Sequence, residues 1–136
     1  MTEGWLDDNY LILFDEHEVQ AASDRYRIAD WLPGYRVIGL WGWDDLVVCD
    51  SLTRVFTVPT VPIDSEYLAP FELPVGPSLK TDPRYTGRVK WYVKPVVFGG
   101  DPAIEENISW ISLDHHAELV VWWNTRYRQI KNGGKS

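Results

Sequence analysis

The chain has 136 residues, a length that suits one domain with a hydrophobic core, so residues 1–136 are predicted to form a single domain. Its net charge of −7 is uneven, because residues 1–72 hold 14 acidic and 4 basic side chains whereas residues 73–136 hold 6 and 9. The resulting balances of −10 and +3 disfavour binding of nucleic-acid phosphates by the N-terminal half. An acidic surface suits a basic protein partner, although solubility alone would also favour such a charge.

Sequence signals for secretion or membrane insertion are missing from the chain. No apolar run approaches the roughly 20 residues that span a bilayer. The N-terminal "MTEGWLDDNY" has neither the basic nor the apolar region of a signal peptide. The single cysteine, Cys49, cannot form an internal disulfide and is expected to be a small buried residue in a strand. We therefore expect a cytoplasmic protein with no membrane contact.

The first predicted helix begins near residue 15. Asp15 is followed three residues later by Glu18, an arrangement that resembles a capping box. Pro33-Gly34 is predicted to end the helix. Before it, residues 10–14 ("YLILF") are either a strand or a lead-in segment packed on the helix. An apolar stripe at three- and four-residue intervals supports the helix: Val19, Ala22, Tyr26 and Ala29.

Three strands are predicted next, over residues 35–40, 46–50 and 53–59. They are rich in β-branched residues, and the intervals between them suit an antiparallel meander. Prolines then punctuate a long and mostly irregular stretch over residues 59–83, in which residues 65–71 ("SEYLAPF") are expected to include a helical turn. Irregular segments of this length in a compact domain are often functional.

The C-terminal half predicts one strand and one long helix. Residues 87–98 alternate apolar and polar side chains as a half-buried strand does, and "GGDP" at residues 99–102 is predicted to be a turn. Ser112 is a plausible N-cap for a helix that ends at Asn132-Gly133. The predicted fold class is α+β, a mostly antiparallel sheet flanked by an N-terminal helix and a long C-terminal helix on one face. The apolar stripe of the last helix consists of His116, Val120, Trp123, Tyr127 and Ile130.

The three histidines do not predict a metal site. His115 and His116 are adjacent and would point about 100° apart on a helix, whereas a helical pair of metal ligands is spaced i and i+4. His17 is distant in sequence, and His116 lies on the apolar stripe, so we expect a packed core histidine. No signature of a nucleophilic triad, a dinucleotide site or a zinc site is present. We therefore expect no catalytic residue, cofactor or metal, and a binding protein is the preferred class.

An ordered set of short motifs runs through residues 10–72: Tyr26 before a Leu-Pro-Gly-Tyr turn (residues 32–35), a strand ending in Ile38-Gly39, a turn with Gly42 and Asp44, a strand ending in Asp50, then Val58-Pro59 and Ala69-Pro70-Phe71. With these motifs the segment resembles the SUKH superfamily. Many members of that superfamily are immunity proteins of bacterial polymorphic toxin systems, so the resemblance implies non-covalent occlusion of a cognate toxin in the cytoplasm, without turnover. The tail from Phe98 onwards is also similar to the tails of small bacterial proteins placed in or near this group.

The chain departs from the family pattern in two places. Members often begin with extra helices, which this sequence does not predict. Their turn is usually a run of glycines, whereas residues 39–43 read "GLWGW". The toxin partner therefore need not resemble the partners of other members.

The tryptophans of this turn have two interpretations. In an extended segment Trp41 and Trp43 would point to the same side, where neighbouring acids would make them a hot spot for a basic protein partner. Alternatively, one or both pack back onto the sheet as core. A small ligand-binding domain or enzyme with a pocket near His116 and the tryptophans remains the alternative function. The residues assigned to partner binding are Trp41, Trp43, Asp44, Asp45, Asp64 and Glu66.

Overall fold

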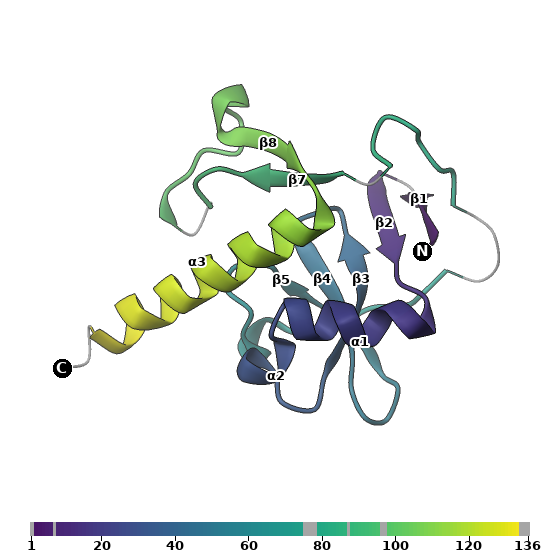
Figure 1. The fold of residues 1–136 in the computed structure, drawn as a ribbon, viewed down its shortest axis with the longest axis horizontal. Helices are drawn as coiled ribbons and strands as arrows, with labels where there is room; N and C mark the ends of the chain where they lie inside the picture. Colours follow the sequence, from purple (N-terminus) through teal and green to yellow (C-terminus); the bar gives the residue numbers. More distant parts are fainter. Residues whose placement is uncertain (1, 7, 75–78, 87, 96–97, 134–136) are drawn as a thin grey trace.

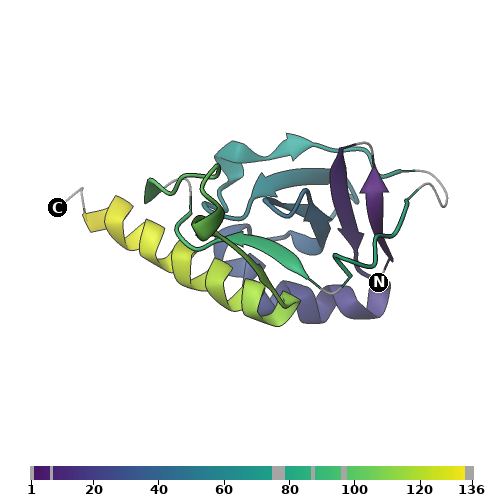
Figure 2. The ribbon, with the colours of Figure 1, turned by 90° about the horizontal axis from the view of Figure 1, so that it is seen from above.

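The computed structural model describes residues 2–6, 8–74, 79–86, 88–95 and 98–133, and these form an α+β fold. A six-stranded antiparallel sheet has the order β1-β2-β3-β4-β5-β6, and a separate hairpin pairs β7 with β8. The N-terminal helix α1 and the long C-terminal helix α3 lie on the same side of the large sheet (Figures 1 and 2). The fold class predicted from the sequence is confirmed.

The large sheet contains the predicted meander and extends it on both sides. Of residues 10–14, all but Phe14 prove to belong to a strand, and β1 was not expected because its sequence, "TEGWL", lacks a run of β-branched residues. Along the outer edge of β1, Trp5 forms two backbone hydrogen bonds, of 2.9 and 3.4 Å, with Lys80 of the long irregular segment. The irregular segment therefore pairs with the edge of the sheet. The strands are β1 (Thr2–Leu6), β2 (Asn9–Leu13), β3 (Arg36–Trp41), β4 (Asp45–Cys49), β5 (Val55–Pro59) and β6 (Ala69–Pro70).

Helix α1 (Glu16–Arg25) begins as predicted but ends earlier. The Asp15 backbone N–H donates to the Glu18 carboxylate at 2.9 Å, which completes the capping box. The helix stops before Arg27, whose φ of 53° is left-handed, and a single turn, α2 (Ile28–Trp31), follows. The predicted apolar stripe fails at this break, because Ala29 is exposed and Ile28 is buried in its place, at 2% exposure.

Strand β7 (Val89–Tyr92) is shorter than the expected strand, and it pairs with an unexpected strand, β8 (Ile108–Ile111). Part of the expected strand, at residues 87, 96 and 97, lies outside the described residues. A short 3-10 turn, η3 (Glu105–Asn107), precedes β8. Asn107 fixes the intervening loop, since its side chain accepts from Lys94 N at 2.7 Å and donates to Lys94 O at 3.0 Å.

Helix α3 (Leu113–Gly133) begins at the predicted cap, where Ser112 Oγ accepts from His115 N at 3.2 Å. His116 and Val120 are fully buried, whereas Ile130 is 52% exposed. The expected stripe is therefore core only in its N-terminal part. The physical reason is visible in Figure 1, where the C-terminal part of α3 extends beyond the sheet.

The chain between β5 and β6 is tied to α3 by a buried amide. Asn124, on α3, is fully buried and accepts from Ile63 N at 2.7 Å while donating to Thr60 O at 2.7 Å. Arg128, one helical turn further, donates to the carbonyl oxygen of Ile63 and lies 4.4 Å from the ring centroid of Trp31. These contacts fix the position of residues 60–63, which lie next to the pocket described below.

Candidate binding pocket

A pocket of about 310 Å³ lies between the β3–β4 turn, the residues that follow β5, and β7. Its volume is at the lower end of the range for small-molecule pockets. Aromatic and acidic side chains make up half of its lining, and three prolines, Thr60 and Val61 complete it. The aromatic and acidic residues are Trp43, Trp91, Tyr92, Asp44 and Asp45.

The turn that carries three of these residues has an unusual backbone. Gly42 and Trp43 both have positive φ angles, 58° and 62°. Glycine adopts this region freely, whereas a non-glycine residue there costs about 1–2 kcal/mol. Two hydrogen bonds hold the turn in place, from Gly42 N to Tyr10 O at 2.8 Å and from Thr60 N to Asp44 O at 3.0 Å.

The two turn tryptophans do not form one patch, because the positive φ angles break the extended geometry on which that expectation depended. Trp43 is only 8% exposed. Trp41 is half-buried and contacts Phe71 instead, with ring centroids 5.1 Å apart. Trp43 is therefore a core residue that also lines the pocket, and the second interpretation given above holds for its packing.

An aromatic cluster surrounds Trp43 on the side of the hydrophobic core. Its ring stacks on Tyr10, with centroids 5.3 Å apart and planes inclined by 12°. Edge-to-face contacts join it to Trp5, Tyr85 and Trp110 at centroid distances of 5.8, 5.3 and 5.1 Å. Such contacts each add about 0.5–1.5 kcal/mol beyond the area that they bury. The pocket wall is therefore rigid before any ligand arrives.

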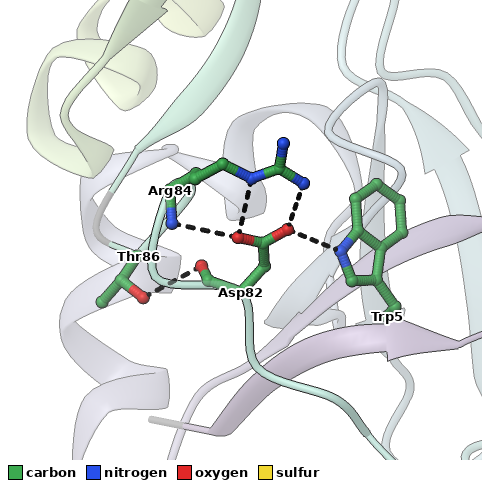
Figure 3. Close-up of polar contacts among 4 residues, drawn as sticks. All are labelled: Trp5, Asp82, Arg84 and Thr86. Carbon is green, nitrogen blue, oxygen red and sulfur yellow. Dashed lines mark hydrogen bonds and ion pairs between the residues drawn. The ribbon is translucent and has the colours of Figure 1, made fainter.

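Asp82 holds the outer part of this cluster in place (Figure 3). Its carboxylate accepts from Trp5 Nε1 at 3.2 Å, from two guanidinium nitrogens of Arg84 at 2.7 and 3.1 Å, and from the Arg84 backbone N at 3.1 Å. The hydrogen bonds from Arg84 hold the pKa of Asp82 well below its usual range. Tyr85 follows directly in sequence, so this anchor places its ring against Trp43. Sequence reasoning missed this link, because Trp5 and Asp82 are 77 residues apart.

The two acids of the pocket differ in their partners. Burial of the carboxyl raises the pKa of Asp44, and the neighbouring Lys90 and the Tyr92 hydroxyl oppose that increase. Burial, followed by repulsion from Asp44, raises the pKa of Asp45 to about 6. The Asp45 carboxylate makes no hydrogen bond or ion pair with any side chain in the described part of the chain. Its negative charge is thus uncompensated.

Lys90 brings a positive charge to the same aromatic surface. Its Nζ lies 5.8 Å from the ring centroid of Trp43 and 5.2 Å from that of Tyr92. These distances fit cation–π contacts. The pocket rings are therefore already in contact with one cation of the chain itself.

Asp64 and Glu66, also assigned to partner binding, do not line the pocket. Asp64 caps the turn η1 (Ser65–Tyr67) by accepting from Glu66 N at 3.0 Å, and it lies 3.7 Å from Lys131 of α3. Glu66 is exposed. The structure therefore brings together Trp43, Asp44 and Asp45 but separates them from these two acids.

His116 is a core residue, as its place on the apolar stripe predicts. Its Nδ1 lies 2.7 Å from the Tyr26 hydroxyl, and burial lowers its pKa to about 3, so the ring is neutral. The centroid of Trp91 is 5.2 Å from that of His116. His116 thus supports a pocket wall without lining the pocket itself.

One group of possible metal ligands occurs in the described part of the chain, formed by Asp15, His17 and Glu18 with ligand atoms within 4.8 Å of one another. Asp15 and Glu18 are both engaged in the capping box of α1. The group is therefore explained by the start of the helix.

Comparisons of the chain with protein-family models, with curated proteins and with solved structures gave no match. In the described ranges, no helix has both the length and the apolar character needed to cross a membrane.

Proposed function

We propose that this protein is an immunity protein that binds a cognate bacterial toxin non-covalently in the cytoplasm. A single observation carries the location of the binding site: two acids and three aromatic rings converge on one pocket at the β3–β4 turn. Such a combination suits a basic protein surface, because the carboxylates select positive charge and the rings give the pocket a rigid apolar wall. The resemblance to the SUKH superfamily supplies the class of partner.

The residues that carry the resemblance have structural roles in the sheet and its turns. Gly39 lies against β2, where an added Cβ would stand 2.2 Å from the Ile12 carbonyl oxygen. Asp50 caps the turn after β4, accepting from Leu52 N and Arg54 N at 3.0 and 2.9 Å. These residues build the sheet and its turns. The intervening β3–β4 turn is then free to differ, which fits a partner particular to this chain.

The packing of the pocket favours tight binding. Trp43 and Trp91 are 8% and 7% exposed, so their rings lose little conformational freedom when a partner docks. Asp44, the more exposed of the two acids, is placed to steer a basic partner during encounter. Rigid aromatic anchors beside a charged rim are typical of binding hot spots.

The test is protection of bacterial cells from the toxin encoded by the neighbouring gene. Co-expression of the wild-type chain should restore growth, and the tagged chain should capture the toxin. Asp45→Arg should abolish both effects, because it places a positive charge against a basic partner. Glu66→Arg is the matched control, since it makes the same charge change at an exposed acid outside the pocket. Equal losses in the two variants, or no capture by the wild-type chain, would contradict the proposal.

A small ligand-binding domain is the second candidate, and the volume of the pocket favours it. Mass spectrometry of the purified protein under native conditions distinguishes the two. A retained small molecule that Asp45→Arg abolishes, together with no toxin capture, would favour this candidate over the immunity role.

A further inference from the structure

The charges around the pocket do not balance. Asp44 and Asp45 contribute two carboxylates from the β3–β4 turn, and Lys90 contributes one ammonium from β7. Tyr92 is the remaining titratable residue that faces the pocket, and the other lining residues are uncharged. Lys90 acts on Asp44, while Asp45 has no partner among the described residues. One negative charge thus remains for a ligand to neutralise.

The aromatic walls are suited to a cation. Lys90 already lies over the rings of Trp43 and Tyr92, which shows that these rings accept a positive group as a neighbour. Trp91 adds another ring to the lining. A cation entering the pocket would therefore meet ring faces and a free carboxylate at the same place.

We propose that the pocket binds one arginine side chain of the protein partner, with the guanidinium paired to Asp45 and stacked on the aromatic wall. A guanidinium is planar, so it can stack on a ring while two of its N–H groups donate to one carboxylate. An ammonium cannot do both, and Lys90 already places one in this region. The assignment to a partner rests on the proposed function, whereas the preference of the pocket for arginine does not.

Lys90 has an opposing role in this arrangement. It neutralises part of the acidic charge and repels a second cation at the same rings. Removal of Lys90 should therefore strengthen arginine binding, which distinguishes a cation site from a purely apolar pocket.

The test uses N-acetyl-arginine amide as the probe, followed by the indole N–H resonances of Trp43 and Trp91. N-acetyl-citrulline amide, which is similar in shape but neutral, and N-acetyl-lysine amide are the comparison probes. We expect saturable arginine binding with a Kd of about 1 mM, as one small contact allows, at least fivefold weaker lysine binding and no citrulline binding. Asp45→Asn should weaken arginine binding about tenfold, Lys90→Ala should strengthen it severalfold, and Glu66→Gln should leave it unchanged.

Several outcomes would overturn the inference. Equal binding of citrulline would show that charge is not recognised, and lysine binding as tight as arginine would show an ammonium site. Unchanged affinity in Asp45→Asn would also contradict it.

The outcomes for the inference and the proposed function are separable. Toxin capture that survives Asp45→Asn and Asp45→Arg would refute the inferred arginine contact alone, whereas specific arginine binding without toxin protection would refute the immunity role and leave an arginine site.

Discussion

The ring of Trp43 stacks on that of Tyr10, with centroids 5.3 Å apart and planes inclined by only 12°. Tyr10 is fully buried on β2, so this stacking ties the β3–β4 turn to the centre of the sheet. The same indole lines the pocket. Binding and stability are therefore coupled at this residue, and a variant of Trp43 cannot report on binding alone.

Trp43→Ala is expected to lower the free energy of unfolding by about 3–5 kcal/mol, the usual cost of truncating a buried tryptophan. Urea denaturation followed by circular dichroism measures the change. Trp122→Ala is the matched control, since Trp122 is 57% exposed on α3 and its loss should change stability by no more than about 0.5 kcal/mol. Comparable stability of Trp43→Ala and the wild type would show that the indole is not part of the core.

Asp45→Asn is expected to stabilise the free protein at neutral pH. The folded-state pKa of Asp45 is about 6, against an ordinary value of 3.8, so the folded protein binds the proton more tightly than the unfolded chain. Stability is therefore lost as pH rises from about 4 to 6. The full shift corresponds to about 3 kcal/mol, and solvent screening of this half-buried group reduces the expected gain at pH 7.5 to about 1–2 kcal/mol.

Urea denaturation of wild type and Asp45→Asn at pH 4 and pH 7.5 measures this effect. The difference should nearly vanish at pH 4, where the wild-type carboxyl is protonated in the folded protein. Asp44→Asn should lower the pKa of Asp45 in an NMR titration, because Asp44 is its charged neighbour. Destabilisation by Asp45→Asn at pH 7.5 would show that the carboxylate has stabilising contacts in the free protein.

Local signals in the sequence predicted much of the fold. The capping box of α1 and the β-branched meander depend on residues close together in the chain, and both are confirmed. The strands β1 and β8 were missed because they are short, and their pairing partners, rather than their composition, make them strands.

The candidate site was predictable only in part. The acids and tryptophans of the turn identified its location, and the structure places Trp43, Asp44 and Asp45 in one pocket. The side of the sheet on which Trp43 packs depends on the positive φ angles of Gly42 and Trp43, which no pattern in the sequence predicted. The opposite wall of the pocket is formed by β7. Because β7 is far from the β3–β4 turn in sequence, the sequence did not predict that the two would form one pocket.

His116 should make the protein less stable in mild acid. Its folded-state pKa is about 3, against an ordinary value of 6.5, so the unfolded chain binds the proton more tightly. Stability is then lost as pH falls below about 6.5, by up to about 1.4 kcal/mol for each pH unit. Ionisation of Asp45 has the opposite effect, because it lowers stability as pH rises from 4 to 6. The pH dependence of the unfolding free energy is therefore measured in an Asp45→Asn background.

His116→Phe in that background should flatten the dependence of unfolding free energy on pH between 7 and 5. It should also cost about 1–3 kcal/mol at pH 7, because the buried Tyr26 hydroxyl loses its partner. An unchanged slope with pH would mean that another group causes the acid sensitivity.

Asn124 links the stability of the fold to the shape of the pocket. Its side chain accepts from Ile63 N and donates to Thr60 O, and Thr60 in turn lines the pocket and donates its N–H to Asp44 O. Asn124→Ala leaves these buried backbone groups unpaired and should cost about 2–4 kcal/mol of unfolding free energy.

Asn124→Asp preserves the acceptor for Ile63 N but loses the donor to Thr60 O, and should therefore weaken binding of N-acetyl-arginine amide even at a temperature where the variant is folded. Thr125→Ala is the control, because Thr125 is exposed on the adjacent position of α3 and its hydroxyl donates only to Val121 O at 2.8 Å. Calorimetry measures the unfolding free energy of each variant, and NMR titration measures its affinity for N-acetyl-arginine amide. If Asn124→Asp binds the probe as tightly as Thr125→Ala does, the segment after β5 does not depend on this amide for its position.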